Sequence, residues 1–310
     1  MRKSVFDSKE EEKLFKRLNT YWSKYLDVFP QLPPRNVFGY DEIMKSDMKI
    51  SAKNFLLKTS FDFVICDITT HAPLLVIEFD GLSGGFSREA EYFIQRPFRD
   101  DPYRELKMNT KLQACRDFNI PAVVVSYQEC ALLEESEQMI NMLDVIIADA
   151  IEKSDHAKNY GKYVGMLSEA YDYGGQESVD ATMIEIEMMS ELANPIKRKL
   201  LDLTKKFPRW GTQFYFSKPD ENGNLSETFN LDLDINTIDG VMYTKRLLTV
   251  NVSIRQVGAF THDPVFLLNT IGEYCLAMKT KKVLGFDWKN WAEAREKAEW
   301  VGLEKERQIQ

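Results

Sequence analysis

Two apolar runs decide the fold of this chain, Phe61-Asp62-Phe63-Val64-Ile65-Cys66-Asp67 and Leu74-Leu75-Val76-Ile77-Glu78-Phe79-Asp80-Gly81. The polar segment between them, Thr69-Thr70-His71-Ala72-Pro73, has the composition of a turn. We therefore expect two strands joined by a tight turn.

Each of these strands carries carboxylates where apolar side chains would be expected. Asp62 lies near the start of the first strand, and Glu78 and Asp80 lie at the end of the second. Glu78 and Asp80 are two residues apart and share one face of their strand. Antiparallel pairing would bring the Asp62 end beside the Asp80 end, so three carboxylates are predicted at one edge of a sheet.

Such a cluster predicts a cation, because burying unpaired carboxylates is costly. Oxygen-rich groups of this kind suit Mg²⁺ or Mn²⁺. Arginines in the following segment could touch phosphates: Arg88, Arg96, Arg99 and Arg104.

The composition is that of an ordinary globular chain of 310 residues with a net charge of −8. The overall charge does not indicate nucleic-acid binding, which would need a local basic patch such as Lys245, Arg246 and Arg255. The four cysteines form no C-x-x-C pair, and no apolar run approaches the roughly 20 residues of a membrane span. We expect a cytoplasmic protein with reduced thiols and no membrane partner.

The N-terminal part is expected to contain a helix, two or three strands, a second helix and a final strand. Ser8 and Glu11 fit a capping box that opens a helix over residues 8–28, and Glu12 is a candidate to lie near the acidic edge. A helix over 103–118 carries Lys107 and Lys111 on one face. Residues 122–126 form a buried strand.

The rest of the chain is expected to be helical first and then rich in strands. Residues 130–193 have a helical pattern interrupted by a loop at 171–175, with a helix at 182–192. Strands are predicted at 213–216, 228–233 and 241–257, with a turn at 219–224. Helices are predicted at 264–279 and 288–308.

The ordered set of Asp62, Glu78-Phe79-Asp80-Gly81, a lysine-bearing helix and an apolar strand resembles the PD-(D/E)XK nuclease superfamily. It looks most like branches with E-x-D-G, such as the very-short-patch-repair-like endonucleases and a domain family of unknown function. The resemblance covers roughly residues 8–127. It implies an α/β (α+β) protein with a restriction-endonuclease-like αβββαβ core at 1–128, a helical extension at 129–194, and a β-rich and helical C-terminal region at 195–310.

The resemblance also implies roles for particular residues. Asp62 and Glu78 would hold Mg²⁺ or Mn²⁺, with the Phe79 carbonyl a third ligand and Asp80 a further ligand or a group that orients water. The superfamily lysine normally stands where this chain has Asp80, so Lys107 or Lys111 would serve from the helix. The implied function is metal-dependent hydrolysis of phosphodiester bonds in DNA.

Two other functions stay open at this point. Relatives often place a histidine soon after E-x-D, and residues 81–104 contain none, so the chain could be a catalytically inactive nuclease-fold module that binds nucleic acid or protein. The C-terminal region could bind a protein partner or a second copy. Alternatively, Gly81-Leu82-Ser83-Gly84-Gly85 matches the G-x-S-x-G of serine hydrolases, with Ser83 as nucleophile and His262 as base.

Overall fold

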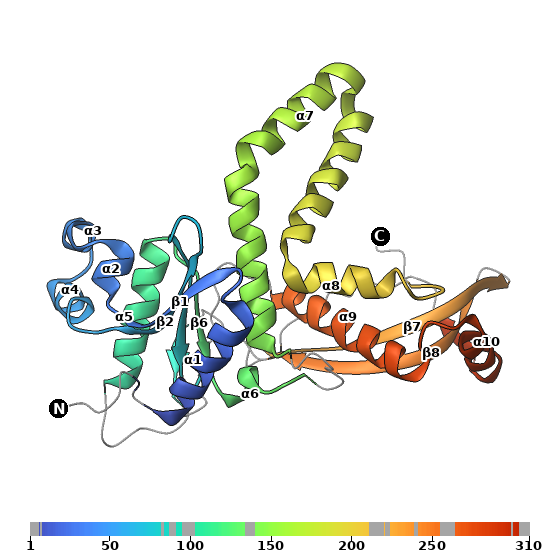
Figure 1. Ribbon diagram of the computed structural model, residues 1–310, viewed down its shortest axis with the longest axis horizontal. Coiled ribbons are helices and arrows are strands. Elements are labelled where there is room, and N and C mark those ends of the chain that lie inside the picture. The colour runs from blue at the N-terminus through green and yellow to red at the C-terminus, as the bar shows by residue number, and fades with distance from the viewer. Residues whose placement is uncertain are drawn as a thin grey trace.

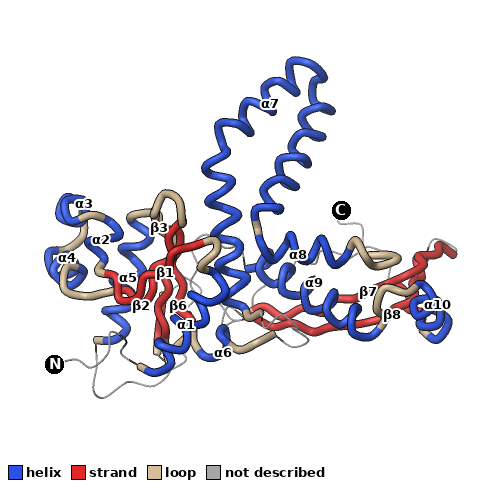
Figure 2. Tube along the Cα trace, in the orientation of Figure 1, coloured by secondary structure: helices blue, strands red, loops and turns tan. Residues whose placement is uncertain are grey.

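The protein is described by a computed structural model, shown in Figures 1 and 2. The structure describes residues 6, 8–81, 84–86, 91–94, 103–133, 140–210, 220, 224–238, 241–254, 264–298 and 300–303. The fold is mixed α+β, as the sequence predicted. Within the described part, no helix has both the length and the apolar character needed to cross a membrane.

The N-terminal part is built on a four-stranded sheet in the order β1-β2-β3-β6, made of β1 (Leu26–Leu32), β2 (Phe61–Asp67), β3 (Pro73–Phe79) and β6 (Ala122–Val125). β2 is antiparallel to both β1 and β3, and β6 is parallel to β3. A parallel neighbour needs a crossover connection. Here the crossover includes a long helix, α5 (Arg104–Asp117).

Helices cover both faces of this sheet. α1 (Lys9–Trp22) packs its apolar face with Phe63, Ile65 and Ile77 into one core cluster. On the opposite face, Val64 and Val76 share a second cluster with residues of α5. Since side chains alternate along a strand, Asp62 and Glu78 belong to the face covered by α5. The remaining elements of this part are short: α2 (Pro34–Phe38), α3 (Tyr40–Lys45), α4 (Ile50–Leu56), β4 (Gly85–Phe86), β5 (Tyr92–Phe93) and α6 (Tyr127–Cys130).

A long helical hairpin, α7 (Met142–Ala193), leaves the sheet and returns as a second limb (Figure 1). Its first turn is anchored to α1, because Asp144 accepts hydrogen bonds from Arg17 and, at 2.9 Å, from Trp22 Nε1. The helical path is broken at Gly175, which has φ 63°. Only glycine adopts this conformation readily, so it suits the point where a helix reverses.

The C-terminal part pairs a three-stranded antiparallel sheet with a buried helix. The order is β7-β8-β9, formed by β7 (Leu225–Ile238), β8 (Val241–Ile254) and β9 (Trp300–Leu303). α9 (Pro264–Val283) lies along β7 and β8, while α8 (Pro195–Thr204) follows α7 and α10 (Trp288–Lys297) precedes β9 (Figure 1). The core cluster around α1 continues through the first turns of α7 into α9 and β7.

The elements of the predicted αβββαβ core occur in the expected order as α1, β1, β2, β3, α5 and β6, with the short α2–α4 inserted after β1 and β4–β5 inserted after β3. Several boundaries were wrong. The first helix ends at Trp22 because β1 already begins at Leu26, and residues 171–175 are helical up to the break at Gly175. The last predicted helix ends at Lys297 and is followed by β9. The strand predicted at 213–216 lies outside the described residues, and the division into three regions stays a prediction.

Candidate active site

The antiparallel register of β2 and β3 places Asp62 at the carboxyl end of β3. Phe63 is opposite Ile77, so Asp62 lies beside the last residues of that strand. The Phe79 backbone N–H donates to Asp62 Oδ2 at 2.8 Å. This contact fixes the carboxylate at the sheet edge where the sequence predicted it.

Glu78 is joined to Lys111 of α5 in a buried ion pair. Lys111 Nζ lies 2.7 Å from Glu78 Oε2 and 2.9 Å from Oε1. Glu78 is only 2% exposed, and the Lys111 side chain is 12% exposed. Of the two lysines predicted from the sequence, Lys111 therefore reaches the acidic edge. Lys107, one turn earlier, is at the surface.

Burial dominates the electrostatics of the two carboxylates. Burial raises the pKa of Glu78, Lys111 lowers it, and the nearby Asp62 charge raises it again, so that the pKa of Glu78 is about 8. Burial also raises the pKa of Asp62, against the opposing effects of Lys111 and the Phe79 N–H. A buried carboxylate with a raised pKa gains from any cation that replaces its proton.

A polar chain that the sequence reasoning missed joins α1 to this site. Gln31 Nε2 lies 3.3 Å from Glu11 Oε2 and 3.5 Å from Asp62 Oδ1, and Ser60 Oγ donates to Gln31 Oε1 at 2.7 Å. Gln31 has φ 53°, a left-handed conformation that is uncommon for a residue other than glycine. Backbone strain of this kind persists where surrounding contacts require it, often at functional sites.

The acid that α1 contributes to this chain is Glu11, and not the predicted Glu12. Glu11 is 6% exposed, whereas Glu12 forms an ion pair with Lys16 on the outer face of the helix at 2.6 Å. Helical spacing could have predicted the burial of Glu11, because this residue lies three positions before the buried Leu14 and shares its face of the helix.

Asp80 was predicted to bind the metal or to orient water, but its carboxylate oxygens accept hydrogen bonds from other groups of the protein. It accepts hydrogen bonds from Arg104 at 3.0 Å, from the Tyr92 hydroxyl at 2.8 Å and from the Gly84 N–H at 2.7 Å. Burial raises the pKa of Tyr92, which keeps its hydroxyl a donor. Gly84 must be small, because a Cβ there would lie 2.5 Å from the Tyr92 hydroxyl.

The predicted cluster of three metal-binding carboxylates is therefore reduced to two. Across the described ranges, no group of three or more His, Cys, Asp or Glu side chains is placed to hold one metal ion. Asp62 and Glu78 nevertheless fit Mg²⁺ or Mn²⁺, because Mg²⁺ commonly takes one or two carboxylates and completes its shell with water and substrate phosphate. In this structure the Lys111 ammonium forms an ion pair with Glu78. The Phe79 carbonyl stays a predicted ligand.

The residues of the serine-hydrolase alternative cannot be compared with this geometry. Ser83 and His262 lie outside the described residues, as do Arg88, Arg96 and Arg99. Of the four arginines expected near phosphates, Arg104 is described, and it lies beside Asp80.

The N-terminal part of the chain matches a known protein family. Residues 2–141 match the model of a family described as "Protein of unknown function (DUF2726)". This segment contains Glu11, Asp62, Glu78 and Lys111, and it ends just before α7 begins at Met142. No curated protein and no solved structure matches the chain.

Proposed function

We propose that the protein is a metal-dependent nuclease that hydrolyses phosphodiester bonds in DNA. The observation that carries this proposal is the convergence of Asp62, Glu78 and Lys111 from β2, β3 and α5 at one end of the sheet. Two carboxylates and a lysine are the groups that this chemistry needs. Their spacing along the sequence also resembles that of the PD-(D/E)XK nucleases.

Each residue has a definable role in this proposal. Asp62 and Glu78 would hold Mg²⁺ or Mn²⁺. The bound ion would supply charge neutralisation at the phosphate and a water of lowered pKa. Lys111 would stabilise the attacking hydroxide or the pentavalent phosphate. Glu11, acting through Gln31, would keep Asp62 in position and accept a hydrogen bond from a water at the site.

Arg104 is a further candidate for contact with the substrate. Its guanidinium is held by Asp80, and its side chain is 31% exposed. Burial raises the pKa of Asp62, and the Arg104 charge is one of the effects that oppose this rise. A guanidinium fixed by a buried carboxylate is preorganised to donate to phosphate oxygens. Asp80 thus becomes a positioning residue for Arg104 and is no longer assigned to the metal.

The test is a cleavage assay on supercoiled plasmid and linear DNA with Mg²⁺, with Mn²⁺ and with EDTA. The wild-type protein should cleave only with a divalent ion, and Asp62→Asn and Glu78→Gln should each lose most of the rate. Glu42→Gln is a matched control, since Glu42 is an exposed acid on α3 that pairs with Lys45. Cleavage that persists in EDTA, or that is equal in all variants, would refute the mechanism.

A second function is favoured by one observation. Lys111 already occupies the cation position of Glu78, which is the arrangement expected of an inactive nuclease fold that binds nucleic acid or protein without metal. In that case, cleavage would be absent under every condition. Fluorescence anisotropy would show DNA binding that is insensitive to Mg²⁺ and to Glu78→Gln. Binding through the C-terminal region, to a protein or to a second copy, stays a prediction.

A further inference from the structure

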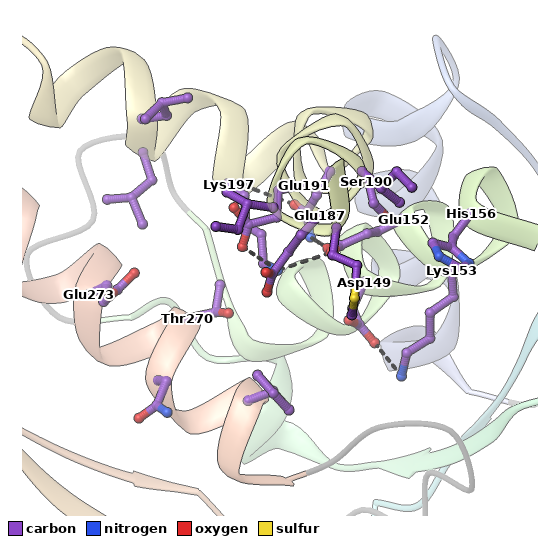
Figure 3. A pocket seen from close by; sticks show the side chains of 18 of the residues that line it. Asp149, Glu152, Lys153, His156, Glu187, Ser190, Glu191, Lys197, Thr270 and Glu273 are labelled. Carbon is purple, nitrogen blue, oxygen red and sulfur yellow. Dashed lines mark hydrogen bonds and ion pairs between the residues drawn. The ribbon is translucent and has the colours of Figure 1, made fainter. Parts of the chain in front are cut away.

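A cavity of about 1250 Å³ lies between the two limbs of α7, with α8 and α9 at its base. Figure 3 shows Asp149, Glu152, Glu187 and Glu191 on the facing sides of the two limbs. The cavity is separate from the Asp62–Glu78 site, since no residue of that site lines it.

Both limbs present apolar side chains to this cavity at helical spacing. Tyr160 and Val164 line it from the first limb, four residues apart, and Met183 and Ile184 line it from the second. These side chains remain open to solvent, with Tyr160 63% and Ile184 60% exposed. Two antiparallel helices ordinarily bury such faces against each other. Here the limbs leave room for another element between them.

The same cavity is strongly acidic. Its lining includes six carboxylates and two lysines, namely Asp149, Glu152, Asp180, Glu187, Glu191, Glu273, Lys153 and Lys197. Both lysines form ion pairs with carboxylates that also line the cavity. Lys153 pairs with Asp149 at 3.0 Å, and Lys197 pairs with Glu152 at 3.0 Å and Glu191 at 3.3 Å (Figure 3). The carboxylates outnumber the cations, so the cavity favours a positively charged occupant.

A buried amide oxygen in the lining of the cavity also lacks a hydrogen-bond partner in the described part of the chain. Asn269 of α9 lines the cavity, is 6% exposed, and has an Oδ1 that accepts no hydrogen bond there. Leaving a buried acceptor unsatisfied costs roughly 1–3 kcal/mol. A donor on an occupant of the cavity would relieve this cost.

We propose that this cavity is a docking groove for an amphipathic helix of a partner protein, rich in lysine or arginine on its polar face. The apolar stripe of that helix would pack on Tyr160, Val164 and Ile184, completing a three-helix arrangement. Its cations would lie near Glu187 and Glu273, and one would donate to Asn269 Oδ1. Met183 suits this role because methionine adapts to partners of different shape. The inference does not depend on the proposed nuclease activity.

The test uses a fluorescein-labelled synthetic peptide of about 18 residues, with leucine at helical spacing and lysine elsewhere. Anisotropy titration should show saturable binding to the full-length protein. Ile184→Asp should weaken it about tenfold or more, because it places a charge in the apolar contact. Ile50→Asp is the matched control: Ile50 is 76% exposed on α4 and should be neutral. Circular dichroism should show that both variants remain folded.

A charge-reversal pair tests the electrostatic part separately. Glu187→Lys with Glu273→Lys should weaken binding, whereas Asp41→Lys with Glu42→Lys changes the net charge equally on α3 and should not. The inference would be overturned if the peptide bound equally well to the wild type and to every variant. It would also be overturned if a peptide with glutamate in place of lysine bound the wild type as tightly as the lysine peptide. A dimer seen by light scattering and dispersed by Ile184→Asp would show instead that a second copy fills the groove.

Discussion

Substituting Glu78 by glutamine should make the protein increasingly stable relative to the wild type as the pH rises from 4.5 to 8. Burial raises the pKa of Glu78 from 4.5 to about 8. The unfolded chain therefore releases this proton near pH 4.5, while the folded chain keeps it to about pH 8. The stability provided by the buried, protonated carboxyl is complete below pH 4.5 and is lost as the pH rises to about 8.

The size of the change in stability follows from the difference between the pKa values of Glu78 in the folded and unfolded chains. Each pH unit between the two pKa values costs about 1.4 kcal/mol, so the full window sets an upper limit of about 5 kcal/mol. The pKa of about 8 already includes the opposing effect of Lys111. Removing the carboxylate also leaves the buried Lys111 ammonium facing a neutral amide, which has a cost of its own. The titration of Glu78 therefore predicts a change with pH: the stability of the variant relative to the wild type should rise by at least about 2 kcal/mol between pH 4.5 and pH 8. Glutamine has the same shape as glutamate and does not titrate. Residue 78 should therefore contribute no pH dependence to the stability of the variant between pH 4.5 and pH 8.

Urea denaturation followed by tryptophan fluorescence, at pH 4.5, 6.5 and 8 in EDTA, measures the difference between the two proteins. Glu42→Gln, on the surface, should match the wild type at every pH. The reasoning is refuted if Glu78→Gln loses stability relative to the wild type between pH 4.5 and pH 8. It is also refuted if the difference between the two proteins is the same at all three pH values.

Three further predictions concern single contacts. Glu11→Gln should lower the rate of DNA cleavage about tenfold or more by weakening the hydrogen-bonded chain to Asp62. Glu10→Gln should not, because Glu10 pairs with Lys13 away from that chain. Equal rates in a plasmid assay would count against the role of Glu11. Gln31→Gly should relieve the strain of the left-handed backbone at this position and should also lower the affinity for metal. A thermal-shift titration should show a midpoint at a higher Mg²⁺ concentration, in a variant that without metal is no less stable than the wild type. Gly272→Ala should lower the free energy of unfolding by about 1–2 kcal/mol, because its Cβ would lie 2.1 Å from the buried Phe229 ring; a gain in stability would contradict the packing described for α9.

The sequence was sufficient for the part of the site that depends on strand geometry. Alternation along β2 and β3 and the five residues between them place Asp62 beside the end of β3, where it accepts a hydrogen bond from the Phe79 N–H. Helical spacing put Lys107 and Lys111 on one face of α5, and the packing of α5 on the sheet decides that Lys111 reaches Glu78. The position of Asp62 follows from periodicity and an antiparallel turn, which are local properties of the chain.

The sequence was not sufficient where the outcome depends on distant groups. Asp80 shares a strand face with Glu78, but its partners Tyr92 and Arg104 come from later elements whose approach no local pattern specifies. The loop predicted at residues 171–175 was wrong for a related reason. A glycine pair usually indicates a loop, whereas here the reversal needs only one residue with positive φ. Glu11 could have been found, since it shares a helix face with Leu14.

The central claim is that Asp62 and Glu78 together bind a divalent cation. Electron paramagnetic resonance of Mn²⁺ tests it directly, because the free ion gives a sharp signal that weakens on binding. The account predicts saturable loss of the signal with the wild-type protein, with binding that tightens from pH 6 to pH 8 as protons leave the site, and strong reduction of binding in Asp62→Asn and in Glu78→Gln. Mn²⁺ binding that is absent in the wild type, or unchanged in both variants, would contradict it.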